Sequence, residues 1–90
     1  MVLATSKIED FDRFWQTFST KGAAKRKEHG SKGAQVFRDP NDDQRVWVAF
    51  DWDGESFQQF VGDPEVREIF KEGGLQGIPQ IAEPAGEMET

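Results

Sequence analysis

The chain has 90 residues, with three Trp, eight Phe and no Cys, and its 11 Lys and Arg against 17 Asp and Glu give a net charge of −6. This length predicts one domain with a small core, and the acidic balance disfavours nucleic-acid binding, which requires a positive surface. Disulfide bonds, thiolate zinc sites and cysteine nucleophiles are excluded, and no apolar run is long enough for a membrane span or a secretory signal, so we expect a cytoplasmic protein without a membrane partner.

The first third of the chain predicts a strand followed by a helix. Residues 2–8 contain β-branched residues and no breaker, and from residue 10 four aromatic residues recur at i, i+3, i+4 and i+7. That spacing is typical of a helix that buries one side. Ser6 or Asp10 can cap the helix, and Gly22 either bends it or ends it. The aromatic stripe consists of Phe11, Phe14, Trp15 and Phe18.

Five basic residues gather around the end of this helix, and two interpretations remain open. They either complement the negative end of the helix dipole as a solvated surface, or they form a rim that binds an anion. The five are Lys21, Lys25, Arg26, Lys27 and Lys32.

The rest of the chain predicts a hairpin, a second helix and a last strand. Residues 34–38 and 45–52 flank a stretch of turn-forming residues, which indicates a hairpin. Helix starts follow in series at Asp53 and Asp63, so the second helix is expected to break between them while it keeps one buried side. A pair of glycines then ends this helix before a short strand at residues 78–83.

The order of these elements predicts the α+β class. Strand, helix, two strands, helix and strand form the ferredoxin-like βαββαβ fold, a four-stranded antiparallel sheet with two helices on one face. We expect a single domain over residues 1–83 and a short, acidic, flexible tail over residues 84–90. The core between helices and sheet is expected to contain Trp15, Trp52, Phe57 and Phe60.

The third predicted strand is apolar on both sides. Two helices can cover only one face of a sheet, so the other face exposes an aromatic patch of the kind that marks association or ligand contact. We therefore predict a homodimer that packs the two open faces together. Val46, Val48, Phe50 and Trp52 point one way, and Trp47, Ala49 and Asp51 point the other way together with either Val36 or Phe37.

Four stretches make the chain resemble the dimeric α/β barrel superfamily, which includes antibiotic-biosynthesis-monooxygenase-like domains and many small bacterial proteins. They are DFDRFW at residues 10–15, VWVAFDWD at 46–53, FVGDPEV at 60–66 and GGLQGIP at 73–79. The resemblance covers nearly the whole chain. It implies a barrel formed by the open sheet faces of two subunits, and a cleft between sheet and helices that often binds small molecules.

The resemblance implies a range of activities and no catalytic residue. Members of the superfamily include cofactor-independent oxygenases of polycyclic phenols, haem-degrading enzymes, isomerases and dismutases. The oxygenase and haem-degrading branches use Asn, His and Trp side chains in the cleft. The single His29 and the single Asn41 of this chain match none of these motifs.

Ligand-binding candidates lie on the predicted open face. Phe37, Trp47 and Asp51, with Arg38 or Gln35 nearby, would form a largely apolar surface with a few polar groups, as small-molecule sites do. The alternative is that these residues only pack a subunit interface.

Two residues are candidates for acid–base chemistry, His29 and Asp51. Histidine titrates near neutral pH, and His29 is either a surface residue or an acid, base or ligand at a cleft. Asp51 is the second candidate base.

No metal site and no cofactor are expected. Asp39, Asn41 and Asp43 have the spacing of a calcium loop, but Gln44 and Phe50 occupy positions that require Gly and Glu, so a turn is the better interpretation. We therefore expect a small homodimeric domain that binds a small hydrophobic ligand or serves in assembly without catalysis. The alternative is a cofactor-independent monooxygenase or related enzyme acting on a hydrophobic aromatic substrate, so enzyme activity stays open.

Overall fold

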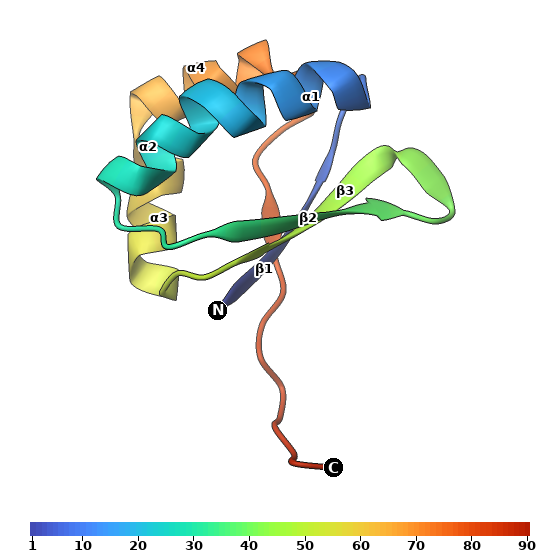
Figure 1. The fold of residues 1–90 in the computed structure, drawn as a ribbon, viewed down its shortest axis with the longest axis vertical. Coiled ribbons are helices and arrows are strands. Elements are labelled where there is room, and N and C mark those ends of the chain that lie inside the picture. The colour runs from blue at the N-terminus through green and yellow to red at the C-terminus, as the bar shows by residue number, and fades with distance from the viewer.

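A computed structural model describes all residues from 1 to 90. Four strands alternate with helical segments in the predicted order (Figure 1). The elements are β1 (Val2–Lys7), α1 (Phe11–Thr17), η1 (Phe18–Gly22), α2 (Ala23–Glu28), β2 (Ala34–Asp39), β3 (Asp42–Phe50), α3 (Gly54–Gly62), α4 (Pro64–Glu72) and β4 (Gln80–Ile81).

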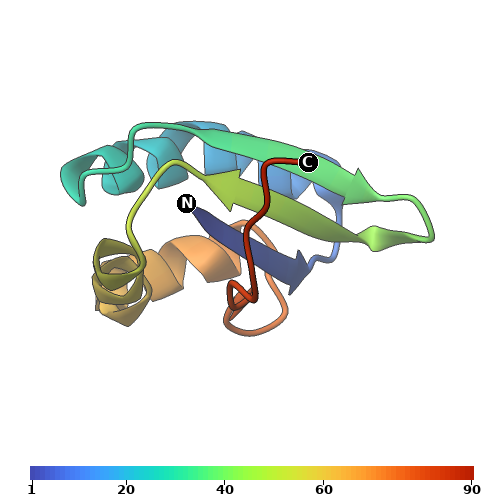
Figure 2. The same ribbon diagram turned by 90° about the horizontal axis from the view of Figure 1, so that it is seen from below.

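The sheet has the order β2-β3-β1-β4, and every neighbouring pair is antiparallel. The helical segments lie on one side of this sheet, and the chain after β4 extends away from the other side (Figures 1 and 2). This arrangement is the ferredoxin-like fold, as the sequence predicted. No helix is both long enough and apolar enough to span a lipid bilayer.

The first helical region starts at Asp10 and continues past Gly22. Oδ2 of Asp10 accepts a hydrogen bond of 3.0 Å from the backbone N–H of Arg13, which makes Asp10 the N-cap in preference to Ser6. Gly22 does not end the helix, because α1 and α2 are joined by η1, a turn of π-helix. The helix stops at His29, and Gly30 follows with a φ of 88°.

The second helical region is broken where the sequence predicted. Asp53 caps α3 through a hydrogen bond of 2.9 Å from Ser56 N–H, and Asp63 caps α4 through one of 2.9 Å from Glu65 N–H. Pro64 occupies the first turn of α4, where its missing N–H costs nothing. The region ends at Gly73, and Gly74 has a φ of 76°.

The core lies between the helices and the covered face of the sheet. The expectation that Trp52, Phe57 and Phe60 belong to it is confirmed, since none is more than 5% exposed. The expectation for Trp15 is wrong, because its side chain is 47% exposed. Phe14 and Trp15 form the two edges of the aromatic stripe, about 100° apart around the helix. The helix is rotated so that Phe14 faces the sheet, which leaves Trp15 stacked on Phe11 and Phe18 at the surface.

Candidate functional site

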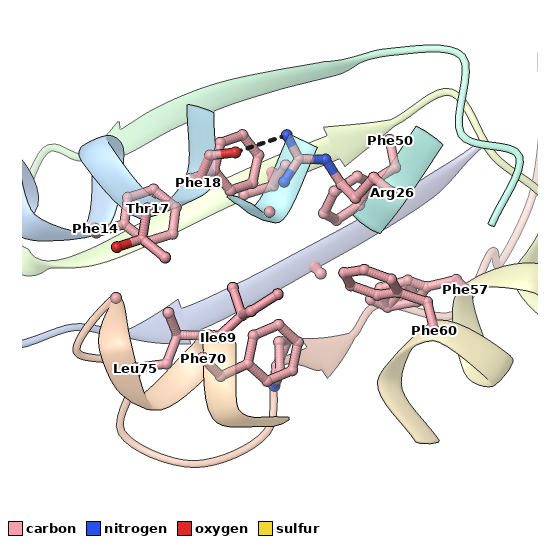
Figure 3. A pocket seen from close by; sticks show the side chains of 15 residues that line it. Phe14, Thr17, Phe18, Arg26, Phe50, Phe57, Phe60, Ile69, Phe70 and Leu75 are labelled. Atoms are coloured by element: carbon pink, nitrogen blue, oxygen red, sulfur yellow. Dashed lines mark hydrogen bonds between the residues drawn. The ribbon is translucent and has the colours of Figure 1, made fainter. Parts of the chain in front are cut away.

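A mostly apolar cavity lies between the helices and the sheet (Figure 3). The space in it that a water-sized molecule can occupy is about 50 Å³. A small-molecule site is normally a largely apolar concavity with a few polar groups. The walls are mostly aromatic and aliphatic: Ala4, Phe14, Thr17, Phe18, Gly22, Arg26, Val48, Phe50, Phe57, Phe60, Ile69, Phe70, Gly73, Leu75 and Pro79.

The cavity has a buried floor and a less buried mouth. Phe50, Phe57 and Phe60 are almost fully buried. The ring of Phe57 lies between the other two, centred 5.3 Å from that of Phe50 and 6.4 Å from that of Phe60. Ile69 and Phe70 of α4 are only half-buried, and they lie across the hollow from Phe18 (Figure 3). A flat apolar molecule that entered between η1 and α4 would therefore meet aromatic faces at the floor.

Arg26 is the one ionisable side chain in the cavity wall. It is 9% exposed, its Cζ lies 3.7 Å from the centroid of the Phe18 ring, and its Nη2 donates a hydrogen bond of 3.0 Å to the Phe18 carbonyl. Burial of the guanidinium lowers the pKa of Arg26 to about 10, so the group is still a cation at neutral pH.

The π-helical turn η1 positions Arg26. Such turns leave the regular helical ladder, and they are frequent at functional sites. Here the hydroxyls of Ser19 and Thr20 donate to the carbonyls four residues earlier, and the Phe18 carbonyl accepts from Arg26. Gly22 provides the space, because a Cβ at that position would lie 3.0 Å from Nη1 of Arg26.

An ion-pair cluster on the outside of the molecule joins α2 to the start of α4. Lys25 pairs with Glu65 and Glu28, and these carboxylates raise the pKa of Lys25. Nε2 of His29 lies 3.2 Å from Oδ2 of Asp63. The backbone N–H of Glu65 and then the imidazole of His29 lower the pKa of Asp63. The cluster therefore ties the C-terminal end of α2 to the cap of α4.

The candidates Phe37 and Trp47 lie together on the open face of the sheet. They are directly opposed in the β2–β3 register, so Phe37, and not Val36, shares the face of Trp47. Phe37 is 52% exposed and Trp47 is half-buried. The indole N–H of Trp47 donates a hydrogen bond of 2.9 Å to Oδ2 of Asp39, which is the main reason that the pKa of Asp39 is lowered.

The other two ligand-binding candidates lie apart from this pair. Arg38 is paired with Val46, a buried residue of the covered face, and its guanidinium carbon is 4.4 Å from the Phe11 ring centroid. Arg38 therefore does not share the open face, because alternate residues of a strand point to opposite sides. Gln35, the other polar neighbour expected there, is paired with Ala49 and therefore lies on the open face with Phe37 and Trp47. Asp51 is exposed, just beyond the end of β3. None of these residues lines the apolar cavity between helices and sheet, and Arg38 lines a separate, mostly polar hollow beside Asp10 and Asp43.

His29 lies outside the cavity wall, at the C-terminal end of α2. Its ring is half-buried, and it stands edge-on to Phe60 with the ring centroids 5.6 Å apart. Its carbonyl accepts a hydrogen bond of 3.0 Å from the indole of Trp52. These contacts give His29 a part in attaching α2 to the core.

The acidic stretch with calcium-like spacing forms the hairpin turn. Oδ1 of Asp39 accepts from the N–H of Asn41 at 2.8 Å, and Oδ1 of Asp42 accepts from the N–H of Gln44 at 2.9 Å. No three His, Cys, Asp or Glu side chains are grouped as metal ligands anywhere in the 90 residues.

Sequence reasoning did not single out Arg26, which it placed among five basic residues at a helix end. The structure separates this group, because Lys21 pairs with Glu72, Lys25 pairs with Glu65, and Arg26 alone is buried. One signal was available in the sequence. A spacing of four residues, which places side chains on one helix face, connects Phe14, Phe18, Gly22 and Arg26.

Comparisons with known proteins give structural neighbours only. No family model matches the sequence, and no curated protein matches it. A conserved protein from Methanosarcina mazei Go1 has a TM-score of 0.61 at 20% identity, over 90% of this chain and 85% of its own.

Two further neighbours carry a provisional assignment as antibiotic biosynthesis monooxygenases. The protein from Deinococcus radiodurans has a TM-score of 0.62 at 17% identity, over 100% of this chain and 97% of its own. The protein from Chloroflexus aurantiacus J-10-fl has a TM-score of 0.57 at 17% identity, over 97% of this chain and 93% of its own. The chain therefore shares the ferredoxin-like fold of antibiotic-biosynthesis-monooxygenase-like proteins, as the sequence resemblance implied.

Proposed function

We propose that the protein is a binding module for a small aromatic molecule, which it holds in the cavity between helices and sheet. The observation that carries this proposal is the cavity floor, where Phe50, Phe57 and Phe60 line an almost wholly apolar hollow. A single aromatic ring is a suitable occupant, because apolar surface removed from water stabilises a complex and aromatic rings pack favourably on one another. The enclosed part is small, so the ring would also occupy the mouth beside Ile69.

Binding without catalysis is the activity that the cavity wall supports best. Proton transfer from a substrate needs a group that accepts the proton within hydrogen-bond reach, and the wall contains no carboxylate and no imidazole. Oxidation of the bound ring is the second candidate, and its support is the provisional monooxygenase assignment of the two structural neighbours. Incubation with phenol in air, followed by mass spectrometry, separates the two, because oxidation adds oxygen to the compound.

The proposed module acts as a homodimer through the open face of the sheet. The support is the pair Phe37 and Trp47 together with Leu3, which is 39% exposed on the same face. Exposed apolar side chains gathered on one face mark association sites in small domains. A second copy of the chain offers the same surface, so that two-fold pairing would cover both patches at once.

Thermal-shift and calorimetric titrations with toluene, benzamide and benzoate test the binding proposal. A ligand that binds only the folded state raises its stability by about 2.7 kcal/mol at a hundredfold excess over the dissociation constant. Ile69→Trp places a large ring at the mouth and should abolish the shift. Glu68→Trp is the matched control, because Glu68 is exposed on the same helix outside the cavity wall. The proposal is wrong if no single-ring compound binds, or if both variants bind as the parent does.

A further inference from the structure

The sheet end of the cavity, formed by Ala4, Val48 and Phe50, presents no polar group to a ligand. None of these three residues is more than 6% exposed, and the surface inside the cavity is almost wholly apolar. Arg26 therefore contributes carbon atoms to this surface, while its Nη2 donates to the Phe18 carbonyl. No fully buried side-chain nitrogen or oxygen of the protein lacks a hydrogen-bond partner. A hydroxyl, amide or carboxylate that reached the sheet end would find nothing to bind.

An apolar cavity of this kind is dry. Its space of about 50 Å³ is large enough for one water molecule. A buried water, however, is held by roughly two to four hydrogen bonds to polar groups, and cavities that lack such groups stay empty. A polar group that entered would lose its own water without gaining a hydrogen bond, which disfavours binding.

The same volume is too small for a whole aromatic ring. A dry cavity of about 150 Å³ accommodates benzene, so the space of about 50 Å³ accommodates only part of a ring. A ring bound here must therefore place one edge against the sheet end and leave the opposite edge in the mouth between η1 and α4, beside the half-buried Ile69 and Phe70 (Figure 3).

The outside of the mouth is polar. Lys21 of η1 and Glu72 of α4 form an ion pair of 2.9 Å between the two helical regions, and both residues are exposed. Each is the neighbour of a residue in the cavity wall, Gly22 in the first case and Gly73 in the second. The two edges of a bound ring would thus meet opposite surroundings, which are dry hydrocarbon at one edge and water with charged side chains at the other.

We propose that the ligand is an aromatic compound whose polar groups all lie on one edge of the ring, and that its hydrocarbon edge faces the sheet end. The inference rests on the proposed function, because it assigns a chemical class to the same ligand. A hydroxyl buried without a partner lowers affinity by roughly ten- to a hundredfold. The cavity therefore selects for the position of polar groups and not only for their number.

Catechol and hydroquinone test this class, because they are isomers with two hydroxyls each. The adjacent hydroxyls of catechol can both remain in the mouth, whereas the opposed hydroxyls of hydroquinone force one of them to the sheet end. In calorimetric titrations under nitrogen, which keeps both compounds reduced, catechol should bind roughly ten- to a hundredfold more tightly than hydroquinone. Phenol, with a single hydroxyl, should bind at least as tightly as catechol.

Val48→Thr tests the orientation of the ligand, because threonine has nearly the shape of valine and adds a hydroxyl at the sheet end. The new hydroxyl should reduce the preference for catechol over hydroquinone by at least about threefold. Val36→Thr is the matched control. Val36 is paired with Val48 in the β2–β3 register, so it lies on the same side of the sheet, but it does not line the cavity. This variant should keep the preference of the parent.

The outcomes separate this inference from the proposed function. Equal affinity of the parent for catechol and hydroquinone overturns the inference but leaves a binding site for aromatic rings. Phenol binding as weak as that of hydroquinone also overturns it, because the mouth would then reject a hydroxyl. An equal change of preference in Val48→Thr and Val36→Thr overturns the orientation. If neither toluene nor any of the three phenols binds the parent, the proposed function itself fails. Should Val48→Thr not fold, the two isomers on the parent protein carry the test.

Discussion

Phe37 and Trp47 stand directly opposite each other on β2 and β3, on the face of the sheet that no helix covers. Phe37 is the more exposed of the two, at 52%, whereas the indole of Trp47 is fixed by its hydrogen bond to Asp39. Cross-strand aromatic pairs stabilise a sheet, but they do not need this much contact with water. We therefore place the pair at the centre of the proposed subunit interface.

Phe37→Lys should dissociate the proposed dimer. The substitution places a charge on each of two facing sheets and removes a side chain whose burial contributes about 1.5–3 kcal/mol, so the dimer dissociation constant should rise at least about tenfold. Sedimentation velocity measures the change, with Phe37→Leu as the control that keeps the surface apolar. A parent protein that sediments as a monomer at high concentration would contradict the prediction.

Gly22→Ala should disturb Arg26, although alanine is the better helix former. A new Cβ would lie 3.0 Å from Nη1 of Arg26 and 3.2 Å from the Thr17 carbonyl oxygen. Gly62→Ala is the matched control at the end of α3, where a Cβ meets nothing within 4 Å. We expect Gly62→Ala to stabilise the protein by about 0.4–1 kcal/mol and Gly22→Ala to fall short of that gain.

The same two variants should differ in ligand binding. Toluene affinity should fall in Gly22→Ala, because Gly22 and Arg26 both belong to the cavity wall, and it should stay unchanged in Gly62→Ala, as measured by calorimetry beside urea denaturation. Equal stabilisation by both substitutions, with equal affinity, would show that Gly22 is not needed to place the guanidinium.

Phe57→Ala should be far more damaging than Trp15→Ala, although tryptophan is the larger residue. Phe57 is 1% exposed and packs against Phe50 and Trp52, so its truncation should cost about 3–5 kcal/mol. Trp15 is half-exposed, so its truncation should cost less than half as much. Urea denaturation gives both values, and Phe57→Leu, expected below about 1.5 kcal/mol, replaces Phe57→Ala if that variant does not fold. Equal losses in the free energy of unfolding for the two alanine variants would show that Trp15 belongs to the core.

The stability conferred by the Asp63 charge should depend on pH in a defined direction. The N–H of Glu65 and the imidazole of His29 hold the pKa of Asp63 below its ordinary value, so the folded state binds the proton more weakly than the unfolded chain does. The contribution of the Asp63 charge to the free energy of unfolding is therefore complete above the unfolded pKa of about 3.9. It is lost as the pH falls through the lower pKa of the folded state.

Asp63→Asn isolates this charge, because asparagine is also a good N-cap. The parent should be more stable than the variant at neutral pH, and the two should converge in urea denaturation as the pH falls below the unfolded pKa of about 3.9. A difference that stays constant down to the lowest pH would assign the effect to the cap and not to the charge.

The sequence by itself determined the features that depend on neighbouring residues. Asp53 and Asp63 mark helix starts and Gly74 marks an end, because capping and backbone conformation involve only a few consecutive residues. The alternation of β3 likewise shows two apolar faces without any knowledge of what packs on them. The strand–helix order and these signals were enough for the fold.

Only the tertiary structure decided which side of each pattern is buried. The stripe of α1 contains both Phe14 and Trp15, and the rotation of the helix on the sheet buries the first and exposes the second. Arg26 looked like one member of a basic surface, yet it is buried and donates a hydrogen bond to the carbonyl of Phe18 at the start of the π-helical turn. Rotation and burial result from contacts between segments far apart in the chain, so the free energy that selects them is absent from any short stretch of sequence.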